Sequence, residues 1–280
     1  MTVFDDRPCE LGEGPLWHPV RQQFFWFDII GRRMLSRDAN GPLEWRFDDM
    51  ASAAGWVDRD RLLIASEGGL AVLDLRDGSM EALAAIEADD FGTRSNDGRA
   101  DRQGGFWIGT MGKSAETGRG AIYRYFRGEV RQLIAPITIP NAICFSPDGT
   151  LAYFADTAVN RVWTWQLDDD GWPVGDPKPF LDLSAMGLSP DGAVIDSAGA
   201  ICVACWGAGK VVRFSQRGER LDDMAVGGLH STCPSYGGSD MCDVLVTTAR
   251  QDIESPDSAQ GLTYLMRASV AGLPEPRVIL

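Results

Sequence analysis

Histidine is nearly absent from this chain of 280 residues, which contains two histidines. Histidine is the most common metal ligand and the usual general base for a serine nucleophile, so its scarcity disfavours a histidine-rich zinc site and a Ser-His-Asp hydrolase. The sequence also has no Gly-x-Ser-x-Gly segment and no glycine-rich loop followed by Lys and Ser or Thr. Serine-hydrolase chemistry and a phosphate-binding loop are therefore disfavoured.

Long apolar runs and blocks of like charge are missing as well. No apolar run approaches the roughly 18 residues of a membrane-spanning helix, and Met1–Asp6 has neither the basic nor the apolar region of a signal peptide. We therefore predict a cytoplasmic protein with no membrane partner. The formal net charge is −14, from 26 basic and 40 acidic residues, with no basic cluster, so a nucleic-acid partner is disfavoured.

The six cysteines lie mostly inside or beside apolar segments. This placement favours buried free thiols over disulfides. Cys202 and Cys205 have the spacing of a redox motif, but they belong to a strand-like run in which residues i and i+3 face opposite sides. We therefore expect no dithiol chemistry there.

A repeat dominates the chain. Each unit contains an apolar strand followed by an alternating strand, and the units recur at roughly 40 to 50 residues, which is the period of β-propeller blades. The predicted apolar strands are 24–27, 62–65, 106–109, 151–154, 200–203 and 244–247, and the alternating strands are 33–36, 69–73, 121–125, 161–165, 210–214 and 262–265. We predict an all-β six-bladed β-propeller with four antiparallel strands per blade, as one domain over residues 1–280.

Two other repeat architectures fit less well. Turn signals such as Pro147-Asp148-Gly149 recur too often for a helical solenoid, and no apolar stripe persists at helical spacing. A parallel β-helix has shorter and more uniform repeats. Lys113–Gly120 is expected to be a longer loop in the third blade.

Four polar residues occupy equivalent places in this repeat. Aligning Glu13–Pro19 with Asn141–Pro147 superimposes an aromatic residue and a proline, and aligning Asn141–Gly149 with Asp191–Gly199 superimposes a glycine; Asn96 fits the same frame. The innermost strand of each blade lines the channel of a propeller. We therefore expect these four side chains to converge at the channel, with positions near Ser52 and Thr232 completing the ring.

Turn chemistry alone could place polar residues at these positions, because turns favour Asn, Asp and Ser. That explanation accounts poorly for Glu13 and for the prolines that precede Asn141 and Asp191. Two carboxylates with amide oxygens form a hard donor set that suits Ca²⁺, Mg²⁺, Mn²⁺ or Fe²⁺, with Zn²⁺ as an alternative. We expect His18 to be a surface or packing residue and His230 to be structural, although His230 could also face the channel.

At these residues the chain resembles the gluconolactonase and regucalcin family, also called senescence marker proteins. The resemblance covers essentially the whole chain, and its specificity lies in the order and spacing of modest motifs. The matching segments are Leu11–Trp17, Arg94–Arg99, Phe106–Met111, Pro140-Asn141, Pro190–Gly192, Asp196–Gly199, Val203–Trp206, Thr232–Gly238, Val246–Arg250 and Gly272–Arg277.

The resemblance implies a propeller that holds one divalent cation and hydrolyses sugar lactones. By position, Glu13, Asn141 and Asp191 match the family's metal ligands, and Asp191 also matches its general base. Arg94 and Asn96 match residues that contact the substrate. Some relatives carry an acidic residue where this chain has Gly112-Lys113, so a preference for gluconolactone does not transfer.

The chemistry agrees with the donor set. A divalent cation can polarise an ester carbonyl, and a carboxylate beside it can take a proton from the attacking water, typically a ~10²–10⁴-fold effect. Asp191 can serve as both ligand and base only if one carboxylate oxygen stays free. Arg94 suits recognition of hydroxyl or carbonyl groups, and an inter-blade salt bridge is its alternative role.

Three functions remain open from the sequence. The first is hydrolysis of a small-molecule sugar lactone to the aldonic acid; the second is hydrolysis of an organophosphate or another ester on the same scaffold. The third is a non-catalytic propeller that binds calcium or a protein partner, because fold does not fix function. A monomer and a weak homodimer are both compatible with the sequence.

Overall fold

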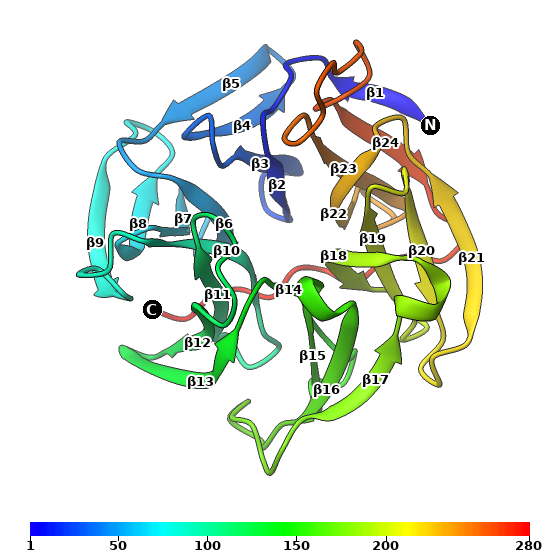
Figure 1. Ribbon diagram of the computed structural model, residues 1–280. Coiled ribbons are helices and arrows are strands. Elements are labelled where there is room, and N and C mark those ends of the chain that lie inside the picture. Colours follow the sequence, from blue (N-terminus) through cyan, green and yellow to red (C-terminus); the bar gives the residue numbers. More distant parts are fainter.

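The computed structural model describes all residues, Met1–Leu280. It contains six antiparallel sheets of four strands each, and its only helices are two short 3-10 turns, η1 (Thr157–Val159) and η2 (Ser184–Met186). Figure 1 shows the sheets arranged as blades around a central axis. The six-bladed propeller predicted from the repeat is therefore confirmed. No helix is long and apolar enough to span a membrane.

Five blades are built from consecutive strands, which follow one another in sequence order from the axis outward. Blade one contains β2 (Gly12–His18), β3 (Gln23–Asp28), β4 (Arg33–Asp38) and β5 (Gly41–Arg46), and blade two contains β6 (Ala51–Trp56), β7 (Arg61–Ser66), β8 (Gly69–Asp74) and β9 (Met80–Ala85). Blade three contains β10 (Thr93–Ala100), β11 (Phe106–Gly112), β12 (Gly120–Phe126) and β13 (Glu129–Ile137). Blade four contains β14 (Pro140–Phe145), β15 (Leu151–Asp156), β16 (Arg161–Gln166) and β17 (Lys178–Asp182), and blade five contains β18 (Ser189–Ile195), β19 (Ile201–Trp206), β20 (Lys210–Phe214) and β21 (Arg220–Ala225).

Blade six joins strands from both ends of the sequence. Its inner strands are β22 (His230–Gly237), β23 (Asp243–Ala249) and β24 (Thr263–Arg267), and its outermost strand is β1 (Thr2–Asp5). β1 pairs antiparallel with β24, with Thr2 opposite Leu265. The ring is thus sealed by main-chain hydrogen bonds, and the edge of β24 is covered. The sequence repeat does not reveal this exchange, because β1 lies outside the first repeat unit.

The hydrophobic core lies between neighbouring blades. Alternate residues of each second strand point into different interfaces, as expected for the two faces of a sheet. Cys205 packs between blades four and five, whereas Cys202 packs with Tyr236 between blades five and six. All six cysteines are free and five are buried, as predicted for buried thiols, and Cys202 and Cys205 face different interfaces, as the strand spacing predicts.

A C-terminal strap, Ala271–Ile279, crosses the channel at one end (Figure 1). Gly272 forms a β-bridge with Asp196 of blade five, and the Ile279 amide donates to the Gly104 carbonyl of blade three at 2.8 Å. Between these points Glu275 forms a buried ion pair with Arg99. Arg99 lies near the end of β10, so the strap occupies the end of the channel where the innermost strands finish.

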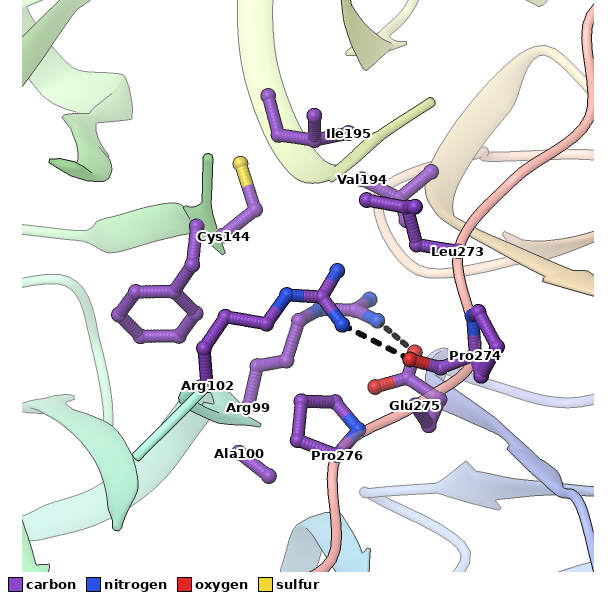
Figure 2. Close-up of a pocket in the computed structure, with 11 residues that line it drawn as sticks. Arg99, Ala100, Arg102, Cys144, Val194, Ile195, Leu273, Pro274, Glu275 and Pro276 are labelled. Atoms are coloured by element: carbon purple, nitrogen blue, oxygen red, sulfur yellow. Dashed lines mark hydrogen bonds and ion pairs between the residues drawn. The ribbon is translucent and has the colours of Figure 1, made fainter. Parts of the chain in front are cut away.

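A small cavity of about 20 Å³ lies under the strap. Figure 2 shows Glu275 and the Pro274 carbonyl facing Arg99 and Arg102, with Cys144 nearby. Arg102 donates to the Pro274 oxygen at 2.9 Å. A cavity of this size can hold about one water molecule, so the strap fills most of this end of the channel.

Candidate active site

A cavity of about 260 Å³ lies at the opposite end of the channel. It lies where the innermost strands begin, and five sequence-predicted residues line it: Glu13 on β2, Arg94 and Asn96 on β10, Asn141 on β14 and Asp191 on β18. The structure therefore brings together residues from four blades that are far apart in the sequence.

Each of these strands has a break in register beside its cavity residue. In β2 the break follows Glu13, in β14 it follows Asn141, and in β18 it falls between Pro190 and Ala193, on either side of Asp191. A bulge leaves residues unpaired with the neighbouring strand and redirects their side chains. The bulges explain how a side chain within a sheet can point along the channel axis.

The residue after Glu13 shows how tightly this geometry is constrained. Gly14 has a φ of +52°, and a Cβ at this position would overlap the Ser52 carbonyl of blade two. Glycine is therefore required both for the left-handed conformation and for the close approach of the two blades. The Gly14 amide also donates to Glu13 Oε2 at 2.8 Å, which orients the carboxylate.

The two remaining equivalent positions do not line the cavity. The Ser52 hydroxyl donates to the Asn96 carbonyl at 2.6 Å, and the Thr232 hydroxyl donates to the Gly12 carbonyl at 2.5 Å. Both side chains are thus used to clamp neighbouring innermost strands together. The repeat position carries a polar group in all six blades, but only four of the blades direct it into the cavity.

A chain of hydrogen bonds fixes the amide side chains across three blades. Arg94 donates to Asn96 Oδ1 at 2.8 Å, and Asn96 Nδ2 donates to Asn141 Oδ1 at 3.0 Å. Asn141 Nδ2 in turn donates to Thr157 Oγ1 at 2.8 Å, and the Thr157 hydroxyl donates to the Pro190 carbonyl at 2.6 Å. Arg94 forms no ion pair, so the inter-blade salt bridge considered as its alternative role is not formed.

The cavity holds buried carboxylates with little positive charge to balance them. Burial, aided by the nearby Asp97 carboxylate, raises the pKa of Glu13 to about 8. Burial and then the Glu13 carboxylate raise the pKa of Asp191 well above its usual range. Neither carboxylate forms a salt bridge, and burial lowers the pKa of Arg94 to about 10. This part of the protein therefore attracts positive charge.

The donor atoms fit a hard divalent cation. Two carboxylates and the Asn141 amide oxygen are hard oxygen donors of the kind that Ca²⁺, Mg²⁺ and Mn²⁺ prefer. A cation among them would lower the carboxylate pKa values, which burial and then the neighbouring carboxylates raise. No group of three or more His, Cys, Asp or Glu side chains forms a metal-binding cluster anywhere in the chain, so this set depends on its amide member.

The rest of the cavity wall was not predicted from the sequence. It includes Met111 at the end of β11, Thr157 just after β15, Trp206 at the end of β19, and Gln251 and Asp252 shortly after β23. The second strand of a blade runs antiparallel to the first, so its last residues lie beside the first residues of the innermost strand. The ends of the predicted second strands were therefore a usable signal.

Lys113 lies beside the cavity without lining it. It begins the loop that joins β11 to β12, as predicted, and its ammonium group lies 2.5 Å from the Glu67 carboxylate of blade two. Ala115, further along this loop, does line the cavity. The loop thus contributes a small apolar side chain to the wall, while its lysine is held at the rim.

Both histidines have structural roles. His18 is fully buried, packs against Trp56, and its Nε2 lies 2.9 Å from the Asp58 carbonyl. His230 stacks on Trp206 at a ring-centroid distance of 4.0 Å and is not part of the cavity wall. The packing role predicted for His18 and the structural role predicted for His230 are confirmed.

Comparison with known proteins places this geometry in a family. Residues 11–250 match the model of the SMP-30/Gluconolactonase/LRE-like region. The chain belongs to this family. The matched segment includes all five sequence-predicted cavity residues, and the resemblance seen in the sequence is confirmed.

Named members of the family differ in substrate. An L-arabinolactonase of Azospirillum brasilense is 31% identical over 99% of this chain and 94% of its own length. A 6-deoxy-6-sulfogluconolactonase of Pseudomonas putida is 29% identical over 96% and 95%, respectively. A solved structure from Agrobacterium tumefaciens strain C58, described as the calcium-binding protein regucalcin, is 39% identical, covers 99% of this chain and 97% of its own, and has a TM-score of 0.96.

Proposed function

We propose that the protein hydrolyses a sugar lactone to the aldonic acid and that this activity depends on a divalent cation. The observation that carries the proposal is the buried cluster of Glu13, Asn141 and Asp191 beside Arg94 and Asn96 in one cavity. Membership in a family with named lactonases supports ester hydrolysis as the reaction class. The proposed substrate is a neutral cyclic ester, which the cavity volume of about 260 Å³ can accommodate.

Glu13, Asn141 and Asp191 would hold the cation. When bound, the cation would supply Lewis-acid polarisation of the lactone carbonyl. The hydrogen bonds from Asn96 Nδ2 to Asn141 Oδ1 and from Asn141 Nδ2 to Thr157 fix the direction of the Asn141 amide. This orientation reduces the reorganisation that binding requires.

Asp191 acts as the general base in this proposal. One carboxylate oxygen takes a proton from the attacking water as the water oxygen forms its bond to the carbonyl carbon. The bond between that carbon and the ring oxygen then breaks, and the ring oxygen leaves as a hydroxyl group by gaining the proton that Asp191 took from the water. The products are the open-chain acid, which ionises at neutral pH, and the regenerated site.

Arg94 and Asn96 orient the substrate. Arg94 uses one of its nitrogens to donate to the Ser95 carbonyl and Asn96 Oδ1, which leaves other guanidinium donors for a substrate oxygen. Their position on one strand, β10, gives the lactone a fixed polar wall. Substrate positioning of this kind lowers the entropic part of the barrier.

Proton release from a panel of aldonolactones tests the proposal. The protein is treated with a chelator and assayed with and without added Ca²⁺, Mn²⁺, Zn²⁺, Fe²⁺ or Mg²⁺, and spontaneous ring opening is subtracted. Cation-dependent opening of at least one lactone is expected. No acceleration with any combination of lactone and cation would overturn the proposal and favour another ester or a binding role.

We also propose that residues 1–280 act as one domain, because β1 and the C-terminal strap tie both ends of the sequence into the ring. The cytoplasmic location and the choice between monomer and weak homodimer stay predictions from the sequence.

A further inference from the structure

We propose that Trp206 and Asp252 form a sugar-recognition subsite, in which the indole receives the C–H face of the lactone ring and the carboxylate accepts hydrogen bonds from its hydroxyl groups. The proposal rests on the proposed function and specifies how that function would select its substrate. Trp206 belongs to blade five and Asp252 to blade six, so the subsite lies across the channel from Arg94 and Asn96 of blade three.

Trp206 gives the cavity a flat apolar surface. It is half-buried, lines the cavity, and packs against a core cluster that includes Leu11 and Ala249. Its indole N–H makes no hydrogen bond within the protein. His230 covers one face of the indole, with an interplanar angle of 20°, and is itself not part of the wall. The cavity therefore meets the remaining surface of the ring.

Asp252 gives the same side of the cavity an unpaired acceptor. Its side chain is exposed, lines the cavity, and forms no hydrogen bond or ion pair within the protein. Its backbone has a φ of +63°, a left-handed conformation that aspartate tolerates better than most residues. An ionised carboxylate is an acceptor with two oxygens, and it can accept from neighbouring hydroxyl groups of one polyol.

His230 holds both parts of the subsite in one arrangement. Its ring stacks on Trp206, and its Nδ1 lies 2.9 Å from the Gln251 carbonyl, one residue before Asp252. Because a carbonyl only accepts, Nδ1 carries the proton in this contact. The backbone N–H of Gln251 also donates to the Glu10 carbonyl at 2.9 Å, which fixes the start of this loop. A single buried side chain thus sets the relative positions of the aromatic surface and the acceptor.

The chemistry of this wall matches a sugar ring better than a simple ester. A sugar ring has one face rich in C–H groups and an edge of hydroxyl groups, and an aromatic surface beside a carboxylate complements both features. Leu11, Met111 and Ile139 supply further apolar contacts in the cavity, whereas Arg94 and Asn96 supply the polar contacts on the far side. A lactone without hydroxyl groups would use only the apolar part.

Steady-state kinetics with paired substrates test each residue separately. The substrates are an aldonolactone and the unsubstituted lactone of the same ring size, δ-valerolactone or γ-butyrolactone. Asp252→Gly removes the carboxylate and suits the left-handed backbone, and it should raise KM about tenfold for the aldonolactone only. Asp252→Asn keeps one acceptor and should fall between Asp252→Gly and the wild type.

Trp206→Leu should raise KM about two- to tenfold for both lactones with kcat nearly unchanged, because stacking is equal in the ground and transition states. Trp206→Phe should recover much of the loss. The matched controls are Trp163→Leu, at a tryptophan that stacks on Phe154 outside the cavity, and Glu254→Gln, on the same loop as Asp252. Both controls should match the wild type.

Saturation-transfer NMR with D-glucose, D-xylose and L-arabinose tests binding without catalysis, on protein with and without Ca²⁺. Ring C–H protons of at least one sugar should receive saturation from the wild type and both controls but not from Trp206→Leu, and binding should weaken in Asp252→Gly.

If the wild type opens no lactone but this pattern holds, the proposed function fails and the subsite stands. If lactones are opened but both variants keep the wild-type KM and NMR signals, the subsite is overturned and the proposed function stands. Absence of any sugar signal from the wild type, together with unchanged KM in both variants, also overturns the subsite.

Discussion

Asn96 and Asn141 join blades three and four through a side-chain hydrogen bond of 3.0 Å from Asn96 Nδ2 to Asn141 Oδ1. The same nitrogen donates to the Pro140 carbonyl at 2.9 Å. One amide group therefore fixes both the backbone and the side chain at the start of β14. The other end of the network is the Thr157 hydroxyl, which accepts from Asn141 and donates to the Pro190 carbonyl beside Asp191.

Replacing Thr157 with valine should weaken cation binding without removing a proposed ligand. Thr157→Val keeps the shape of the side chain but leaves the Asn141 amide and the Pro190 carbonyl unpaired. We expect about a tenfold loss of divalent-cation affinity, as is typical when a group that orients a ligand is lost. Calorimetric titration with Ca²⁺ and Mn²⁺ measures the cation affinity. Thr164→Val in β16 is the control. Wild-type affinity in Thr157→Val would show that the network does not orient Asn141.

Glu13 and Asp191 should each be necessary for turnover. Glu13→Gln and Asp191→Asn preserve side-chain size but remove the charges that would hold the cation. We expect each to lower kcat/KM by at least about 10²-fold with the fold intact, as judged by circular dichroism. Asp191→Asn should remain inactive at saturating cation because it also lacks the base. Full activity of cation-loaded Asp191→Asn would contradict the proposed mechanism.

Arg94 should act mainly on substrate binding. Arg94→Ala removes the free guanidinium donors and should raise KM for an aldonolactone about tenfold or more, since a hydrogen bond from a charged group is lost. Arg94→Lys keeps the charge but loses the planar arrangement of donors, so its KM should lie between those of Arg94→Ala and the wild type. Initial rates over a range of lactone concentrations measure both effects. An unchanged KM in Arg94→Ala would assign Arg94 a structural role only.

His18 should make the free energy of unfolding depend on pH. Burial lowers the pKa of His18 below its ordinary value. Between the unfolded-state pKa, about 6.5, and the lower folded-state pKa, the unfolded chain binds a proton that the folded protein does not. The contribution is therefore complete above pH 6.5 and decreases as the pH falls. Urea unfolding at pH 7.5 and 5.5 should show a smaller loss on acidification in His18→Phe than in the wild type; equal losses would contradict the prediction.

The ion pair between Arg99 and Glu275 should matter more when half of it is removed than when both residues are replaced. Glu275→Gln leaves a buried guanidinium without its counter-charge and should cost about 3–5 kcal/mol of unfolding free energy. The double variant Arg99→Met/Glu275→Leu removes both charges and should recover most of this loss. Urea denaturation of the single and double variants measures the difference. Equal destabilisation by both would show that the pair acts through packing alone.

The repeat was sufficient to predict the blades because each blade buries an apolar second strand, and this requirement recurs with the same spacing. It also predicted which residues meet in the cavity, because rotation about the ring axis brings equivalent positions together. Trp206 and Asp252 were not predicted because no residue type recurs at the ends of the second strands; their place at or just beyond a strand end was the only signal, and it marks a position rather than a chemical role. β1 and Glu275 were missed because their partners, Leu265 and Arg99, are fixed by ring closure and by the strap, which no repeat specifies.

The C-terminal strap determines how substrate and product can enter and leave the channel. With Glu275 seated on Arg99 and only a water-sized space beneath it, the channel is a dead end rather than a passage. Under the proposed function, lactone must enter and aldonate must leave through the same opening of the cavity. Bound product therefore prevents the next substrate molecule from binding, and accumulated aldonate competes directly with lactone for this one opening.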